Sequence, residues 1–185
     1  MRKLKLQVQT SVDGYMSGPN GEMDWMHFPW SDDLTAYVTE LSQFDTIVLG
    51  RTLAEGFIPT WAANPEHETQ EAIDLMNKTP KVVISNSLTE SPWDNATVAG
   101  GDLSEIINGL KAQPGGDIIV YGGGTLVQSL IAAELIDELH LFVNPTAIGV
   151  GLPVFPAESY ARLQLVGATA FDCGITALTY QPKRA

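Results

Sequence analysis

Cysteine, histidine and basic residues are scarce in this chain of 185 residues. The single cysteine, Cys173, excludes an internal disulfide framework. The histidines His27, His67 and His140 lack the spacing of a zinc site, so we expect no bound metal. No stretch reaches the roughly 18 apolar residues of a membrane-spanning helix, and residues 1–6 lack the apolar run of a secretory signal. These absences predict a cytoplasmic protein without a membrane partner.

Positive charge is outnumbered throughout the chain. There are 10 lysines and arginines against 22 aspartates and glutamates, which gives a net charge of -12. Such a surface repels nucleic acid and anionic membranes, because both bind through positive potential. A small molecule is the expected partner, and an anionic one needs a local arginine or backbone N–H donors. With 44% hydrophobic and 17% charged residues, we expect one folded domain over residues 1–185.

Strand-like and helix-like segments alternate in the first three quarters of the chain. Compact runs rich in β-branched residues predict buried parallel strands. The expected strands cover residues 4–11, 46–49, 82–84 and 118–121. Capping residues and apolar positions at helical spacing predict helices between them. The expected helices cover residues 31–41, 66–77, 102–110 and 125–135.

The last quarter of the chain has a different pattern. Residues 139–143, 163–166 and 175–180 are strand-like, and a turn at residues 172–174 predicts that the last two strands form an antiparallel hairpin. The fold class is therefore α/β, with a mainly parallel mixed sheet and an antiparallel C-terminal hairpin. Ligands of such sheets bind at the carboxyl ends of the parallel strands.

Three consecutive glycines, Gly122, Gly123 and Gly124, join a buried strand to a helix that begins with Thr125 and Leu126. Glycine lets backbone N–H groups approach a pyrophosphate closely, and a helix N-terminus adds unpaired donors and a favourable dipole. The Rossmann pattern would need a glycine in place of Val127, and no Gly-Lys-Ser/Thr of a Walker loop occurs. The alternative is a tight turn without a ligand.

The glycine turn and four other segments resemble the dihydrofolate reductase-like superfamily, in particular the reductase domain of riboflavin biosynthesis. The matching segments read IIVYGGGTL with LIDEL, SVDGYMSG, DTIVLGRT, KVVISN and NPTAIGVGLPVF. Together they extend over nearly the whole chain. The resemblance implies a three-layer α/β/α fold, NADPH as the cofactor and a homodimer. The family's Gly-Arg-x-Thr-x-Glu pattern is altered here, because Leu53 takes the threonine position while Glu55 matches.

The resemblance also implies site residues. Arg51 would bind the 2′-phosphate, Ser85 would add a hydroxyl to the same phosphate, and a cis peptide would join Gly122 to Gly123. The implied cofactor-binding residues are Val8, Gln9, Gly50, Arg51, Thr52, Ser85, Asn86, Gly122, Gly123, Gly124, Thr125 and Leu126. The implied substrate-binding residues are Ser11, Gly14, Trp25, Pro145, Gly149 and Gly151, with residues 13–25 forming a loop that closes over the nicotinamide. The alternative for this loop is an ordinary Asp-Gly turn.

Proton donation to the substrate calls for an acid whose pKa is shifted toward neutrality. Asp13, Asp32 and Asp33 are the candidates, since partial burial at a cleft raises the pKa of a carboxyl group. Asp32 and Asp33 can equally be ordinary charges at a helix start.

Three functions remain open from the sequence. The first is an NADPH-dependent reductase that resembles 5-amino-6-(5-phosphoribosylamino)uracil reductase. The second is a divergent dihydrofolate reductase, which the lack of a hydroxyl in residues 138–144 disfavours. The third is a protein that binds NADPH or another ligand without catalysis. The zinc deaminase motif that accompanies bacterial riboflavin reductases does not occur in this sequence.

Overall fold

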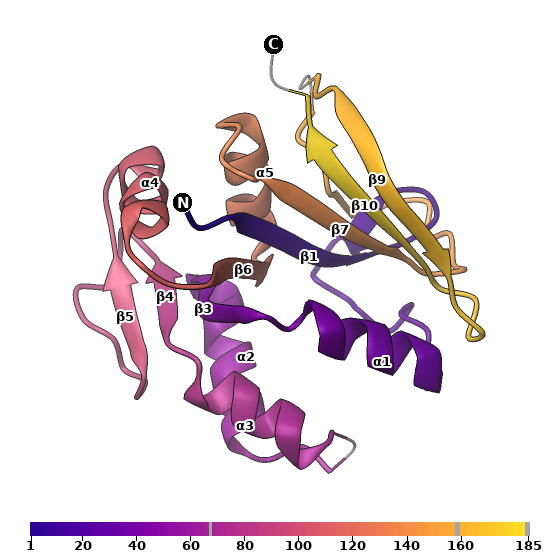
Figure 1. Ribbon diagram of the computed structural model, residues 1–185, viewed down its shortest axis with the longest axis horizontal. Coiled ribbons are helices and arrows are strands. Elements are labelled where there is room, and N and C mark those ends of the chain that lie inside the picture. Colours follow the sequence, from indigo (N-terminus) through magenta and orange to yellow (C-terminus); the bar gives the residue numbers. More distant parts are fainter. Residues whose placement is uncertain (67, 158–159, 184–185) are drawn as a thin grey trace.

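The computed structural model describes residues 1–66, 68–157 and 160–183 (Figure 1). Eight strands form one sheet in the order β5-β4-β3-β6-β1-β7-β10-β9. The six parallel strands are β1 (Leu4–Thr10), β3 (Phe44–Gly50), β4 (Lys81–Ile84), β5 (Ala96–Ala99), β6 (Asp117–Gly122) and β7 (Glu138–Val143). The antiparallel strands β9 (Leu163–Ala170) and β10 (Thr176–Pro182) complete it as the predicted hairpin. A separate pair joins β2 (Tyr15–Ser17) to β8 (Leu152–Pro153).

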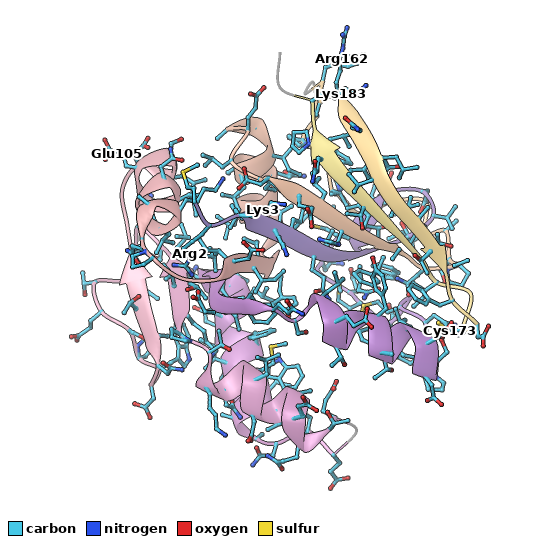
Figure 2. The ribbon with its side chains drawn as sticks, in the orientation of Figure 1. Arg2, Lys3, Glu105, Arg162, Cys173 and Lys183 are labelled. Atoms are coloured by element: carbon cyan, nitrogen blue, oxygen red, sulfur yellow. The ribbon has the colours of Figure 1, made fainter. Side chains whose placement is uncertain are left out.

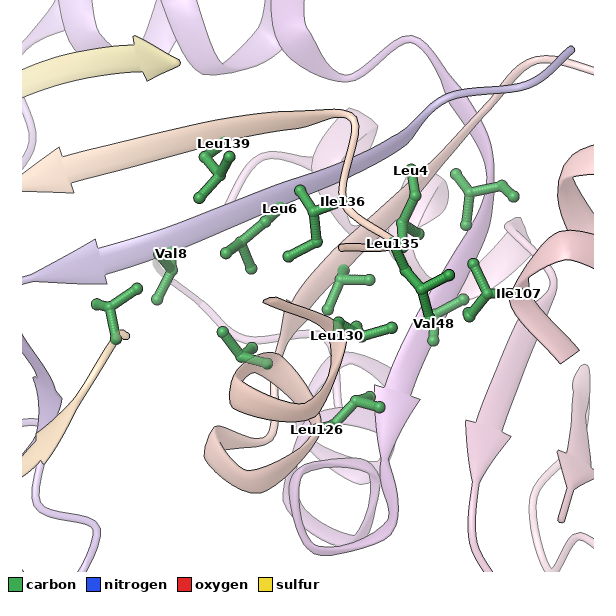
Figure 3. Close-up of a cluster of buried hydrophobic side chains, with 14 of the residues drawn as sticks. Leu4, Leu6, Val8, Val48, Ile107, Leu126, Leu130, Leu135, Ile136 and Leu139 are labelled. Atoms are coloured by element: carbon green, nitrogen blue, oxygen red, sulfur yellow. The ribbon is translucent and has the colours of Figure 1, made fainter. Parts of the chain in front are cut away.

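Helices cover both faces of the sheet, which confirms the three layers (Figure 1). They are α1 (Asp32–Leu41), α2 (Arg51–Ala62), α3 (Gln70–Lys78), α4 (Leu103–Ala112) and α5 (Gly124–Ala132). Apolar residues of α4 and α5 pack with β1, β6 and β7 on one face, where Leu4, Leu6 and Leu130 are fully buried (Figure 3). On the other face α2 and α3 pack over β3 and β6, and α1 packs over β7 and β10.

Several predicted boundaries change for local reasons. The helix expected at residues 66–77 begins at Gln70, because Thr69 caps it, and His67 lies outside the described residues. The helix expected to reach residue 135 ends at Ala132, and Glu134 then adopts a positive φ of 54° that breaks the helical path. The sequence did not predict β2, β5 or β8, which have only three, four and two residues.

Ion pairs made by two buried cations hold the amino ends of the parallel strands together. Arg2, which is 7% exposed, pairs with Asp45 and donates to the carbonyl of Gly116 at 2.6 Å. Lys111, which is 3% exposed, pairs with Asp137 at 2.5 Å and donates to the carbonyl of Leu135 at 2.6 Å. These contacts tie β3, β6 and α4 to the segments that precede β1 and β7.

The described residues contain neither a membrane-spanning helix nor a cluster of metal-binding side chains. No helix there is long and apolar enough to cross a membrane. In the same residues, no group of three or more histidine, cysteine, aspartate or glutamate side chains is placed to hold a metal ion.

Candidate functional site

The two glycine turns at the carboxyl ends of β3 and β6 touch each other. Gly50 is the N-cap of α2, and Gly123 is the N-cap of α5. A Cβ atom placed on Gly123 would lie 3.1 Å from the Cα of Gly50. Because β3 and β6 are neighbours in the sheet, this contact brings the first turns of both helices to the same place. The sequence placed Gly50 and Gly122–Gly124 in one site, and the structure brings them together.

The N-termini of α2 and α5 differ from those of the other capped helices. Neither receives a hydrogen bond from its N-cap side chain, since both caps are glycine, and neither has an acidic residue in its first turn. In contrast, Thr69 caps α3 and Asp102 caps α4 through side-chain oxygens. Unpaired N–H groups and two converging positive dipole ends favour an anion at the glycine turns.

One arginine lies directly after the glycine turn of β3. Arg51 is the first residue of α2, its side chain is 44% exposed, and its guanidinium pairs with Glu55 at 2.6 Å. An exposed pair of this kind contributes little to stability and leaves the remaining guanidinium donors available. Thr52 and Thr125 are exposed in the first turns of α2 and α5, whereas Leu126 is buried beneath Gly50.

The expected cis peptide between Gly122 and Gly123 is not present. In the described part of the chain the cis peptide bond is Phe28-Pro29, and the Gly122-Gly123 bond is trans. Positive φ angles of 145° at Gly122 and 90° at Gly123 make the turn instead. Glycine adopts these angles without the steric cost that a Cβ imposes, so the turn forms with an ordinary peptide geometry.

Ser85 and Asn86 lie at the same edge of the sheet, after β4. The Ser85 hydroxyl accepts hydrogen bonds from the backbone N–H groups of Ser87 at 3.2 Å and Leu88 at 3.1 Å. The Asn86 side-chain oxygen accepts from the N–H of Gly101 at 2.8 Å. Both side chains therefore shape the loops that follow β4 and β5, and their contact with a cofactor stays a prediction.

Asp13 joins two loops on the other side of the glycine turns. Its carboxylate accepts hydrogen bonds from the backbone N–H groups of Gly149 at 2.7 Å and Ile148 at 3.2 Å. The hydroxyl of Ser11 and the N–H of Gly149 hold the pKa of Asp13 below its usual value. The expectation that burial raises this pKa is wrong, because the exposed carboxylate is stabilised in its ionised form.

Asp33 anchors the C-terminal hairpin to α1. Its carboxylate accepts from the N–H of Asp172 at 3.2 Å and from the N–H of Leu34 at 2.8 Å. Hydrogen bonds, first from the Ser31 hydroxyl and then from backbone N–H groups, lower the pKa of Asp33. The predicted rise toward neutrality is wrong here as well. Asp32 is exposed as the first residue of α1.

Asn144 is a central residue that the sequence analysis did not select. It directly follows β7 and has no exposed surface. Its side chain donates to Gln9 Oε1 at 2.8 Å and accepts from the N–H of His27 at 2.9 Å. It therefore fixes the ends of β1 and β7 and the loop that contains Trp25. A polar residue directly between a buried strand and Pro145 is the signal that could have revealed it.

The segment from Asn144 to Leu152 packs directly on the start of α5. A Cβ atom on Gly124 would lie 1.9 Å from the Cδ2 of Leu152, and one on Gly151 would lie 2.1 Å from the carbonyl oxygen of Ser17. Glycine is required at position 151 because the backbone of β2 comes this close, whereas at position 124 the neighbour is the movable end of the Leu152 side chain. The predicted residues Gly149 and Gly151 thus lie between the Asp13 loop and the glycine turn.

The remaining predicted residues surround the same region. Val8, in β1, is buried on the face of the sheet that α5 covers, and Gln9 is half-buried beside Asn144. Gly14 has a φ of 88° and accepts the N–H of Val154. Trp25 donates its indole N–H to the carbonyl of Glu22 at 3.0 Å, within its own loop. Pro145 packs near Gly174, at the tip of the hairpin.

A separate cavity lies at the amino end of β7. Its volume is about 250 Å³, and it is lined mainly by apolar residues from the end of α5, β7 and the ends of β9 and β10. None of the predicted site residues lines it. The candidate site is therefore the open surface at the carboxyl ends of β1, β3, β6 and β7, which is where parallel sheets bind ligands.

The layers, the strand order and the converging glycine turns define a dihydrofolate reductase-like α/β protein. The chain belongs to the RibD C-terminal domain family, whose pattern it matches over residues 2–177. Protein YyaP of Bacillus subtilis (strain 168) is 30% identical over 182 residues, which cover 97% of this chain and 94% of YyaP. Protein YwjB of the same organism is 25% identical and covers 92% of each chain. Neither name states an activity.

Solved structures agree with this family assignment. A Shewanella protein named for riboflavin biosynthesis has a TM-score of 0.76 and 26% identity, with 98% of this chain and 99% of the other covered. A deaminase/reductase of Thermotoga maritima has a TM-score of 0.70 and 15% identity, and the match covers 98% of this chain and 57% of that larger protein. Dihydrofolate reductase of Enterococcus faecalis, complexed with NADP(H), has a TM-score of 0.63 and 16% identity, covering 98% and 97%. The latter two show the shared fold.

Proposed function

We propose that this protein is an NADPH-dependent reductase that transfers a hydride to a pyrimidine-like substrate, as its membership of a riboflavin-biosynthesis reductase family suggests. One observation carries the proposal. The glycine turns of β3 and β6 touch, and each is the N-cap of a helix without a side-chain cap. Two such helix ends favour a dinucleotide pyrophosphate despite the net charge of -12.

The residues present fit this cofactor. The backbones of Gly123 and Gly50 lie so close that a Cβ atom on Gly123 would press on Gly50. Without side chains at these two positions, the backbone itself forms the surface that a pyrophosphate would approach. Arg51 stands at the start of α2 and supplies the cation for a 2′-phosphate, because a guanidinium binds phosphate through two parallel hydrogen bonds. NADPH, when bound, supplies the hydride, and the protein positions the acceptor beside it.

Asp13 serves in this proposal as a positioning residue. Its ionised carboxylate ties the loop after β1 to the backbone of Ile148 and Gly149. This contact holds the side of the site opposite the glycine turn. Since hydrogen bonds lower the pKa values of both Asp13 and Asp33, we propose that water delivers the proton that accompanies hydride transfer.

Titration of protein with NADPH, followed by turnover, tests the proposal. We expect NADPH fluorescence to report micromolar binding, and oxidation of NADPH with ribosylaminopyrimidine substrates but not with dihydrofolate. No binding at roughly 1 mM NADPH would refute the proposal, because enzymes typically work with KM values of about 1 μM to 1 mM. Efficient turnover of dihydrofolate would instead assign the protein to the folate reductases.

The Arg51→Ala variant separates the two cofactors. We expect a loss of NADPH affinity of about tenfold to a hundredfold, the equivalent of one charge-assisted phosphate contact. NADH affinity should change by less than about threefold, because NADH lacks the 2′-phosphate. Lys78→Ala is the matched control, since Lys78 also forms an exposed pair, with Asp74, four residues away on a helix. Equal losses for NADPH and NADH would remove Arg51 from the 2′-phosphate site.

A second function is supported by one specific observation. Neither Asp13 nor Asp33 has a pKa raised toward neutrality, so neither carboxyl is prepared as an acid. A protein that binds NADPH without turnover is consistent with this arrangement. Micromolar NADPH binding together with no turnover on any pyrimidine or pterin substrate would favour this second function.

A further inference from the structure

We propose that the cavity at the amino end of β7 is a second binding site, which takes a small apolar monocarboxylate such as a medium-chain fatty acid. The cavity lies beside the C-terminal end of α5, whereas the glycine turn precedes the N-terminal end of the same helix. The proposed reduction uses no residue of this cavity, so the assignment is independent of the proposed catalysis. Three observations carry it.

The first observation is the apolar wall of the cavity. Ile136 and Leu139 are buried there, and Ile131, Phe155 and Leu163 are half-buried around them. The volume of about 250 Å³ equals that of roughly eight water molecules at about 30 Å³ each. An apolar group is stabilised by leaving water for such a wall. The cavity therefore suits a short hydrocarbon chain or a single ring.

The second observation is a pair of cations where the cavity opens to solvent. Arg162 and Lys183 line the cavity and are exposed. Figure 2 shows both at the same end of the C-terminal hairpin. The N–H of Lys183 donates to the carbonyl of Arg162 at 2.8 Å, so the two residues lie opposite each other just beyond the paired ends of β9 and β10. Like charges in this arrangement destabilise the pair, and a bound anion removes the repulsion.

The third observation is that these two cations differ from the others in the described part of the chain. There, the other lysines and arginines pair with carboxylates, except Lys81, which donates to backbone carbonyls. Within the same residues, neither Arg162 nor Lys183 has a carboxylate partner, and the Arg162 guanidinium lies 5.9 Å from the ring centre of Tyr160. In a chain with a net charge of -12, two such cations at one cavity favour an anion from outside.

One carboxylate at the cavity limits the charge of this anion. Glu134 lines the cavity and follows the C-terminal end of α5, where the helix dipole is negative. Two cations outweigh this single carboxylate, so the net charge of the lining side chains is positive by one. A monoanion therefore fits better than a dianion such as a phosphate ester. A carboxylate also accepts two parallel hydrogen bonds from one guanidinium, which Arg162 can supply.

Calorimetric titration of the full chain with octanoate tests the site. We expect a dissociation constant below about 1 mM. Hexanoate should bind at least about fivefold more weakly, because each buried methylene group strengthens binding by roughly fourfold. Octanol should also bind at least about fivefold more weakly, because it lacks the charge that the cations attract. No binding at roughly 5 mM octanoate, or equal affinity for octanol, would overturn the proposal.

Opposite charge changes locate the bound octanoate. Arg162→Gln and Lys183→Gln should each weaken octanoate binding by at least about fivefold, whereas Glu134→Gln should strengthen it by about twofold, because it removes a like charge. All three residues are exposed, so the fold should be retained, which circular dichroism can check. Lys78→Gln, which removes an exposed cation of α3, is the matched control and should leave the affinity unchanged. Equal affinity in all four variants would show unspecific binding and overturn the proposal.

Competition with NADPH separates this cavity from the candidate site. The octanoate affinity should stay within about threefold at roughly 1 mM NADPH, because the cavity and the glycine turn lie at opposite ends of α5. Displacement of octanoate by NADPH would place octanoate at the glycine turns and overturn the assignment. A failure of NADPH to bind would refute the proposed reductase and leave the octanoate titration and its variants as an independent test of the cavity.

Discussion

At the amino ends of the parallel strands, buried cations meet carboxylates, whereas at the carboxyl ends glycine turns leave helix N–H groups without side-chain partners. Lys111 and Arg2 each make several polar contacts at the first end. At the second end, the N-caps Gly50 and Gly123 have no side chain that could satisfy α2 and α5. The difference teaches that side chains stabilise the fold at one end of the sheet, whereas at the other end the first N–H groups of two helices are left without a side-chain cap.

The largest expected effect comes from removing a buried cation at the amino ends of the parallel strands. Lys111→Met removes the cation that pairs with Asp137 and donates to Leu135, and we expect unfolding free energy to fall by about 3–5 kcal/mol. Urea denaturation measures this loss. Affinity for NADPH should stay within about twofold, because Lys111 lies far from the glycine turns along the strands. Lys78→Met, at an exposed pair, should cost less than about 1 kcal/mol. A loss of NADPH affinity in Lys111→Met would contradict the separation of the two ends.

The next largest effect concerns the glycine turns at the carboxyl ends of β3 and β6. Gly123→Ala forces a Cβ onto a residue with a φ of 90° and brings it against Gly50. We expect a loss of about 1–2 kcal/mol in stability and at least about tenfold in NADPH affinity, as the two turns move apart. Gly174→Ala is the matched control, since Gly174 also has a φ of 90° and an added Cβ would lie no closer than 3.5 Å to its neighbour Pro145. It should lose comparable stability and keep NADPH affinity. Equal losses of affinity in both variants would refute a phosphate site at Gly123.

The smallest effect concerns the Asp13 contact and depends on pH. Because the pKa of Asp13 is lower in the folded protein than in the unfolded chain, its ionised form stabilises the fold. This contribution is complete above about pH 5 and is lost as the pH falls below about 4, through the folded-state pKa. We therefore expect the melting temperatures of wild type and Asp13→Asn to differ at neutral pH and to converge in acid. A constant difference across this range would show that the ionised carboxylate is not what holds residues 148 and 149.

Sequence patterns predicted the parts of the fold that depend on local composition. Buried runs such as residues 118–121 are apolar because both of their faces are covered, and periodicity reveals this directly. The strands β2 and β8 have only three and two residues, and the edge strand β5 has no buried residue, so none of the three shows such a pattern. The prediction of a cis peptide between Gly122 and Gly123 was wrong, because positive φ angles at these two glycines make the turn.

The candidate site was predictable only where it consists of backbone. The glycine turns are visible in the sequence because glycine itself is the functional feature. The pKa values of Asp13 and Asp33 are lowered first by the nearby hydroxyls of Ser11 and Ser31 and then by N–H groups more than a hundred residues away, and no local pattern shows the distant partners. Asn144 was missed for a related reason, because its role depends on the distant residues Gln9 and His27.

The contact between Gly124 and Leu152 has a consequence for how these proteins vary in nature. A methyl group at position 124 would lie 1.9 Å from the leucine side chain, so the two positions share one fixed volume. Among related proteins, a larger residue at position 124 should occur together with a smaller one at position 152. Variation at the glycine turn is thus coupled to variation at a residue of β8 that lies 28 positions away in the chain.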